Sequence, residues 1–314
     1  MTTSPRPTNP RYRFLEPAAL QELKNLRFIA KRIVEGSFAG RHRSNIRGSS
    51  VEFADYREYS PGDDLRRLDW KVYLRTRRPY IRTFDEETNL TVLLAVDTSR
   101  SMDFGGRESR GARGAALTKL NYARYLAAAL AYLVVQSRDQ AGLALVANDL
   151  AGWHAPGSTH RHLDGLLNLL ERAEVGKSTR LGAGLESLFT LVRRRGILIL
   201  VSDFLDENLD DLFRMVRLYR HRRFEVILFH VIHPEEQALP YGRNFRFVDS
   251  EGGGELEVDP RDVEQGYAAA FEAHRLRVRN LALGCGCEYE PVETGVTYPD
   301  AIRAYLRVRE AFAR

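Results

Sequence analysis

The sequence lacks the features that define several common classes of protein. Only two of its 314 residues are cysteines, Cys285 and Cys287, so a four-ligand zinc site cannot be completed from cysteine and both are interpreted as buried thiols in or beside a strand. No apolar run approaches the roughly 20 residues that cross a bilayer. The first residues also lack the apolar core of a signal peptide. These absences predict a cytoplasmic protein with no membrane span.

Familiar catalytic motifs are missing as well. The eight histidines form no His-x-x-x-His or His-Glu-x-x-His pair, the spacings that hold zinc on one face of a helix. Neither the Gly-x-Ser-x-Gly motif nor the phosphate-binding Gly-x-x-x-x-Gly-Lys-Ser/Thr loop occurs. We therefore expect a protein that is not an enzyme. The main alternative is a metal-dependent hydrolase or phosphotransferase that uses the metal site described below.

Positive charge is concentrated at the front of the chain. Residues 1–84 carry 18 Lys and Arg against 9 Asp and Glu. Such a surplus suits nucleic acid, anionic lipid or an acidic protein surface. However, charges of both signs are interleaved, as in residues 63–69 (DDLRRLD), and this favours internal ion pairs. Nucleic-acid binding through the basic N-terminal region is therefore only the third hypothesis.

From residue 91 onward, apolar strands alternate with helical stretches, the pattern of βαβ units in a parallel sheet. The predicted strands are 91–96, 141–147, 196–202, 224–232 and 287–292. The predicted helices are 114–137, 159–173, 181–194, 207–221, 260–282 and 298–312. A hairpin is expected within 239–258, because three consecutive glycines separate two alternating segments there.

The predicted domain organisation has four parts. Residues 1–15 are rich in Pro and Arg and are expected to be disordered, whereas 16–35 have the periodicity of an amphipathic helix. Residues 36–90 mix Gly, Ser and Arg with short β-prone pieces, which predicts a small β-rich subdomain joined by the hairpin near 239–258. Residues 91–314 form the main α/β domain.

The most informative segment is the end of the first predicted strand of that domain. A buried apolar run ends in Asp97, and Ser99 and Ser101 follow at alternating positions. Taken alone, this Asp-x-Ser-x-Ser pattern is explained more readily by a turn or a helix cap than by a metal site. One carboxylate and two hydroxyls also suit Mg²⁺, a hard cation that prefers oxygen ligands and retains water.

Two further segments are expected at the same place, because ligands bind beyond the carboxyl ends of the strands in an open parallel sheet. Asp203 follows the strand at 196–202, and Thr179 lies in the loop that opens the predicted helix 181–194. Three oxygen-bearing loops at one sheet edge favour a metal site over three separate caps.

This constellation resembles the metal-ion-dependent adhesion site of von Willebrand factor A domains. The resemblance implies a metal, Mg²⁺ with Mn²⁺ or Ca²⁺ as alternatives, held by Asp97, Ser99, Ser101, Thr179 and Asp203. It also implies an open position for an Asp or Glu of a partner protein.

One position departs from that pattern, because Arg180 stands where an Asp often follows the Thr. A cation at this position either opposes metal binding or helps to hold an acidic partner. Arg180 and Arg100 are therefore the candidate partner-binding residues.

A narrower resemblance covers about residues 36 to 250. The block 52–70 (EFADYREYSPGDDLRRLDW), the piece 75–80 (RTRRPY) and Ser202-Asp203-Phe204 look like the signature of the domain-of-unknown-function 58 family. Members are bacterial or archaeal, carry a von Willebrand A-like domain and often accompany AAA+ ATPases of the MoxR type.

This second resemblance implies a fold and a class of partner, but no reaction. The implied fold is α/β, with a Rossmann-like, von Willebrand A-type, mostly parallel sheet flanked by helices and a small β-rich subdomain. The implied partner is a MoxR-type ATPase, an acidic client protein or both, so the chain would act as a metal-dependent interaction module. The Arg-rich signature block is either a structural clamp or a docking face.

Overall fold

The computed structural model describes residues 14–15, 23, 26, 51–60, 68–86, 90–106, 118–176, 179–193, 195–237, 239, 245–248 and 254–313. The described residues fall into two compact units, one within 1–37 and 90–314 and one within 38–89. The boundaries of the four predicted parts stay predictions.

The smaller unit is built on a two-stranded antiparallel sheet of β1 (Val51–Glu58) and β2 (Tyr80–Glu86). Between them lies the short helix α3 (Trp70–Thr76). The Asp69 carboxylate starts this helix by accepting hydrogen bonds from the backbone N–H groups of Lys71 and Val72, at 2.9 and 3.2 Å. The β-prone pieces predicted within residues 36–90 thus correspond to the strands β1 and β2. Residues 61–67 of the signature block lie outside the described residues.

The larger unit contains a six-stranded sheet in the order β10-β7-β6-β3-β4-β5. All neighbouring strands are parallel except β4 and β5. The strands are β3 (Thr91–Asp97), β4 (Gln140–Val146), β5 (Leu150–Gly157), β6 (Ile197–Ser202), β7 (Glu225–Ile232) and β10 (Glu288–Glu293). The five predicted strands are thus confirmed to within a residue or two, and β5 was missed.

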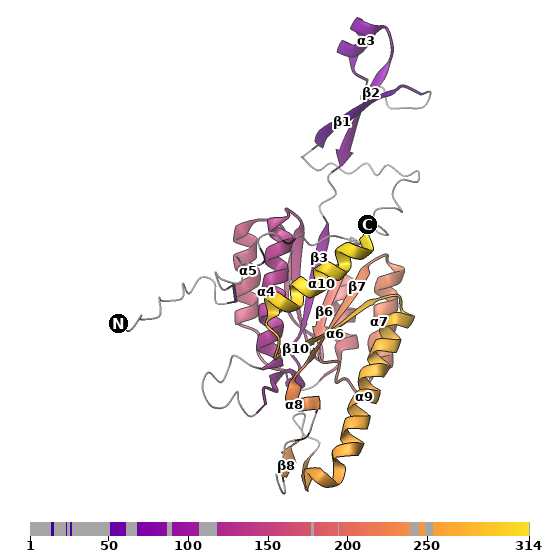
Figure 1. The fold of residues 1–314 in the computed structure, drawn as a ribbon. Coiled ribbons are helices and arrows are strands. Elements are labelled where there is room, and N and C mark those ends of the chain that lie inside the picture. Colours follow the sequence, from indigo (N-terminus) through magenta and orange to yellow (C-terminus); the bar gives the residue numbers. More distant parts are fainter. Residues whose placement is uncertain are drawn as a thin grey trace, which may run out of the picture. The chain divides into compact units, whose positions relative to one another are not determined.

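The predicted helices are also present. They are α4 (Lys119–Gln136), α5 (His160–Glu171), α6 (Leu181–Leu191), α7 (Leu209–His221), α9 (Pro260–Gly284) and α10 (Tyr298–Ala313). A further short helix that was not predicted, α8 (Pro234–Gln237), follows β7. The predicted mostly parallel sheet flanked by helices is confirmed (Figure 1).

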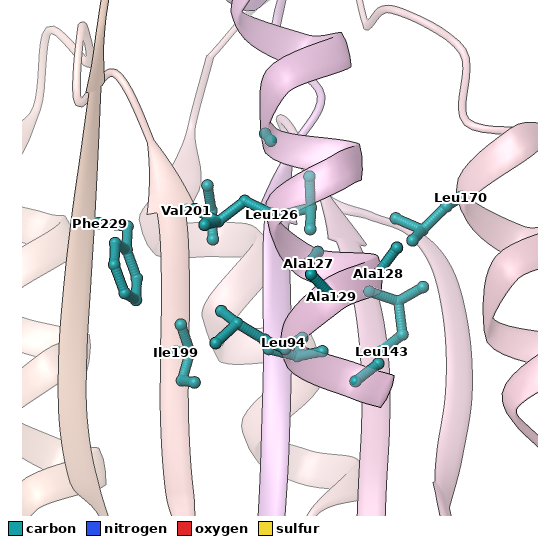
Figure 2. Packing of buried hydrophobic residues seen from close by; sticks show 14 of the residues in the cluster. Leu94, Leu126, Ala127, Ala128, Ala129, Leu143, Leu170, Ile199, Val201 and Phe229 are labelled. Carbon is teal, nitrogen blue, oxygen red and sulfur yellow. The ribbon is translucent and has the colours of Figure 1, made fainter. Parts of the chain in front are cut away.

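Both faces of the sheet are buried, and alternate residues of each central strand serve different cores. Val92, Leu94 and Val96 of β3 pack in one core with α4, α5 and α10. Leu93 and Ala95 pack in the other core with α6, α7 and α9. Figure 2 shows α4 lying along the first face, with Ala127, Ala128 and Ala129 among the side chains of the strands. Burial on both faces explains why these strands are almost wholly apolar in sequence.

The predicted hairpin is present as β8 (Phe245–Val248) and β9 (Glu255–Val258), which pair antiparallel in a separate two-stranded sheet. Its association with the 36–90 region stays a prediction.

The structure describes only a few residues of the two predicted N-terminal parts, residues 1–15 and 16–35. Phe14 and Leu15 are buried in the first core, which corrects the prediction of disorder at these two residues. Leu23 is buried there too and Leu26 packs against it, while the rest of the predicted helix 16–35 lies outside the described residues. Among the described residues, no helix combines the length and apolarity needed to cross a membrane.

Candidate functional site

The predicted ligands lie at the carboxyl ends of β3 and β6, two neighbouring parallel strands in which Val96 is opposite Val201. The chain leaves β3 for α4, which packs on one face of the sheet, and leaves β6 for α7, which packs on the other. Strand ends followed by helices on opposite faces form the switch point at which open α/β sheets bind ligands. The fold thus places Asp97 and Asp203 at the edge that the sequence predicted.

The first loop, which follows β3 and contains Ser99 and Ser101, holds Asp97 in a fixed orientation. Its carboxylate is fully buried and accepts a hydrogen bond from the Ser99 backbone N–H at 2.7 Å and one from the Ser202 hydroxyl at 2.6 Å. The hydroxyl oxygens of Ser99 and Ser101 are 3.1 Å apart. The two serines predicted as neutral ligands therefore lie side by side, immediately after the Asp.

The third loop begins at Asp203 and bends sharply. Phe204 has a left-handed backbone with φ of 54°, an unusual conformation for a non-glycine residue that is often found at functional sites. The Asp203 carboxylate accepts a hydrogen bond from the Leu205 N–H at 3.1 Å and another from the Ser101 side chain. Ser101 therefore connects the first and third loops directly.

The second loop, which precedes α6 and contains Thr179, is hydrogen-bonded to the first and third loops. The Gly176 N–H donates to the Thr98 carbonyl of the first loop at 2.7 Å. The Leu181 N–H donates to the Asp206 carboxylate of the third loop at 2.8 Å. Thr179 lies between these two anchors and is buried. The three predicted loops are therefore assembled at one edge, and ligation by Thr179 stays a prediction.

Burial and charge give the two aspartates different proton affinities. Burial raises the pKa of Asp97 to about 7, and the nearby negative charge of Asp203 adds to this rise. Burial also acts on Asp203, but the charge and hydrogen bond of Lys119, together with hydrogen bonds from Leu205 and Ser101, hold the pKa of that carboxyl below its usual value. Two buried carboxylates beside hydroxyl groups, with more negative than positive charge, form a donor set that fits a hard divalent cation.

Lys119 and Glu236 are central residues that the sequence analysis missed. The Lys119 ammonium is fully buried and donates to Asp203 Oδ2 at 2.7 Å and to the Glu236 carboxylate. One sequence signal was available, because Lys119 opens an otherwise apolar helix. A cation at a helix N-terminus is disfavoured by the helix dipole, so its presence indicates a specific anionic partner.

A histidine behind the site supports the third loop. His230 of β7 is buried, its Nδ1 forms a hydrogen bond with the Tyr289 hydroxyl at 2.7 Å, and its ring also bonds to the Asp203 backbone. Burial lowers the pKa of His230 to about 3, so the ring is neutral at physiological pH. His230 therefore positions the loop and contributes no charge to it.

Exposed apolar and basic side chains surround the buried carboxylates. Phe104, just after the first loop, is 40% exposed, and Leu205 of the third loop is 41% exposed. Arg100 and Arg180, the predicted partner-binding residues, are both exposed on the first and second loops. The combination of a buried acidic centre with an apolar and basic rim is a surface suited to recognition.

The chain belongs to the family described as "Protein of unknown function DUF58", whose model matches residues 55–277. This confirms the resemblance drawn from the signature block and from Ser202-Asp203-Phe204. The family description states no activity.

The chain is also similar to individual proteins and solved structures. The chain is 32% identical over 277 residues to "Uncharacterized protein Rv1480" of Mycobacterium tuberculosis, covering 86% of this chain and 83% of the relative. Two solved structures are similar in fold at low identity. BatB from Bacteroides thetaiotaomicron is 17% identical with a TM-score of 0.43, covering 71% of this chain and 98% of BatB. The SpRpn10 VWA domain is 10% identical with a TM-score of 0.39, covering 69% and 95%.

Proposed function

We propose that this chain is a metal-dependent protein-interaction module. Mg²⁺, or Mn²⁺ or Ca²⁺ in its place, would be held at the carboxyl edge by Asp97, Ser99, Ser101, Thr179 and Asp203. The observation that carries the proposal is the buried pair Asp97 and Asp203, linked through Ser99 and Ser101 in a cluster with surplus negative charge.

The residues have separate tasks in this proposal. Asp97 and Asp203 supply the negative charge, and Ser99 and Ser101 supply neutral oxygen ligands that leave the ion only partly neutralised. Thr179 contributes a ligand from the second loop. When bound, the metal supplies an open coordination position that attracts a carboxylate from outside the chain.

The rim around the site supports a protein as the partner. Phe104 and Leu205 provide apolar contact area, and Arg100 and Arg180 provide positive charge beside it. An acidic side chain flanked by apolar residues on a partner complements both features, and aromatic and Arg residues are enriched in protein interfaces. The partner that we propose is a MoxR-type AAA+ ATPase, an acidic client protein or both, in the cytoplasm.

His230, the buried histidine that bonds to the Asp203 backbone, is poorly suited to activate water for hydrolysis. A histidine that acts as a general base needs a ring nitrogen free to accept a proton from water. His230 instead uses its ring for hydrogen bonds to Tyr289 and to the Asp203 backbone, and its pKa of about 3 makes it a poor base.

The decisive experiment measures binding of the purified chain to a MoxR-type ATPase, in Mg²⁺ and in EDTA. We expect EDTA to weaken binding, and Asp97→Asn to lower the affinity at least about 100-fold in Mg²⁺, since a charged ligand is lost from a buried site. Asp103→Asn is the matched control, because Asp103 is an exposed carboxylate at the end of the same loop.

Circular dichroism of both variants checks that the fold is retained. Equal affinity in Mg²⁺ and EDTA, with Asp97→Asn matching the wild type, would refute metal-dependent recognition at this edge.

A further inference from the structure

Lys119 occupies an unusual position for a lysine. It is the first residue of α4, it is fully buried, and its backbone N–H donates to the Phe104 carbonyl at 2.9 Å. That hydrogen bond fixes the start of α4 against the end of the first loop. The side chain therefore has no route to solvent and directs its ammonium into the buried cluster.

The ammonium stays charged there because of two carboxylates. Burial on its own lowers the pKa of Lys119, but Asp203 and Glu236 more than reverse this and hold the pKa above its usual value. An ion buried in this way is tolerated only while its partners remain in place. Lys119 thus depends on Asp203 and Glu236, and each of them depends on Lys119.

Glu236 belongs to a different part of the fold from Asp203. It lies on α8, its Oε2 accepts a hydrogen bond from the His233 N–H at 3.0 Å, and its backbone carbonyl accepts one from the Tyr267 hydroxyl of α9 at 2.8 Å. Glu236 is therefore held by α8 and α9, whereas Asp203 is held by the third loop. Lys119 joins these two parts through a single side chain.

We propose that Lys119 is a built-in cation that competes with the divalent metal for Asp203 and thereby sets the metal affinity of the site. This inference rests on the metal site of the proposed function. Without metal, Lys119 neutralises Asp203 and keeps the third loop in place. A metal ion on Asp203 repels the ammonium, which then shifts its hydrogen bonding toward Glu236. Glu236 favours metal binding at Asp203, because it gives Lys119 a second carboxylate to pair with.

The charges give this proposal a definite order of affinities. When all are ionised, Asp97, Asp203, Glu236 and Lys119 carry a net charge of about −2, and metal binding strengthens as that charge becomes more negative. Lys119→Met removes the competing cation and keeps the length of the side chain. Glu236→Gln removes the alternative partner and keeps the shape. Metal should therefore bind most tightly to Lys119→Met, less tightly to the wild type and least tightly to Glu236→Gln.

The test is isothermal titration of Mg²⁺ alone into the full-length protein, together with the rise in melting temperature that Mg²⁺ produces. We expect Lys119→Met to bind Mg²⁺ roughly ten-fold more tightly than the wild type, and Glu236→Gln roughly ten-fold more weakly. Metal-free Lys119→Met should also melt at a lower temperature, because Asp203 and Glu236 lose their counter-ion. Lys71→Met is the control, since Lys71 is an exposed lysine and its change should leave Mg²⁺ binding unaltered.

Mg²⁺ affinity of Lys119→Met that is equal to or weaker than that of the wild type overturns the inference. If Lys119→Met does not fold without metal, Glu236→Gln decides, and unchanged or tighter binding by that variant overturns it. The proposed function can fail separately. Partner binding that is indifferent to EDTA, combined with the expected order of Mg²⁺ affinities, supports the role of Lys119 and refutes metal-dependent recognition.

Discussion

The two edges of the central sheet both bury a cation between carboxylates, but they do so in different ways. At the amino edge, Arg309 of α10 is 2% exposed and contacts Glu288 at 2.8 Å and Glu225 at 2.8 Å. The Tyr305 hydroxyl donates to the same Glu288 at 2.9 Å. This cluster ties α10 to the starts of β7 and β10.

The carboxyl edge uses a lysine in place of an arginine. The compact ammonium of Lys119 serves Asp203 and Glu236, whereas Asp97 accepts its hydrogen bonds from neutral groups of Ser99 and Ser202. A guanidinium holds carboxylates in a rigid fork, while an ammonium is a point charge on a flexible stem. The sheet thus has an arginine clamp at its amino edge, and at its carboxyl edge it has the lysine that we propose to exchange with a metal.

The largest effect should come from removing the clamp. Arg309→Met leaves Glu225 and Glu288 buried without a cation, which we expect to lower the free energy of unfolding by about 3–5 kcal/mol, measured by urea denaturation. Arg307→Met is the matched control, because Arg307 is an exposed arginine on the same helix. Mg²⁺ affinity should not change in either variant. If Arg309→Met were as stable as Arg307→Met, the amino edge would not be a clamp.

A smaller effect is expected at the exposed rim of the carboxyl edge. Phe104→Ser and Leu205→Ser should each weaken partner binding roughly ten-fold, because each removes a side chain that is available to a partner, and leave urea unfolding almost unchanged. Leu218→Ser is the control, since Leu218 is also 41% exposed but lies in the second half of α7. Equal losses of affinity in all three variants would place the partner elsewhere.

The smallest effect concerns access to the amino edge. Cys287 immediately precedes β10 and is 5% exposed, and burial raises the pKa of its thiol to about 12. The thiolate that reacts with iodoacetamide is therefore scarce below pH 9. Peptide mass spectrometry of the native protein should show alkylation of Cys285, which is only half-buried, with Cys287 unmodified until urea is added. Equal labelling of both in the native state would show that this edge opens.

The sheet and the loops of the candidate site could be predicted from the sequence, because both have local sequence signals. Strands buried on both faces are continuous apolar runs, as at 91–96, and the Asp-x-Ser-x-Ser and Ser-Asp-Phe segments follow directly at their carboxyl ends. The edge strand β5 gave no such signal, because it is only partly buried and contains Gly152 and Pro156.

The ion pairs of Lys119 could not be predicted from local sequence patterns. Lys119 and Glu236 are 117 residues apart in the chain, and they meet only when α4 is packed on the sheet and β7 carries α8 to the same edge. Their pairing depends on tertiary structure, so no spacing rule finds it. The position of Lys119 at a helix start was the only local sign that an anion lies near.

The alanines of α4 carry a consequence for how this site can vary. Ala127, Ala128 and Ala129 are fully buried and have short side chains, which lets the helix lie close to the sheet (Figure 2). Because a helix is rigid, the distance between α4 and the sheet also determines how far Lys119, two turns or more away, reaches toward Asp203. Larger side chains at these alanines would move α4 away from the sheet and the Lys119 ammonium away from Asp203. Substitutions at these alanines are thus expected to change the affinity of the proposed metal site without altering any of its proposed ligands.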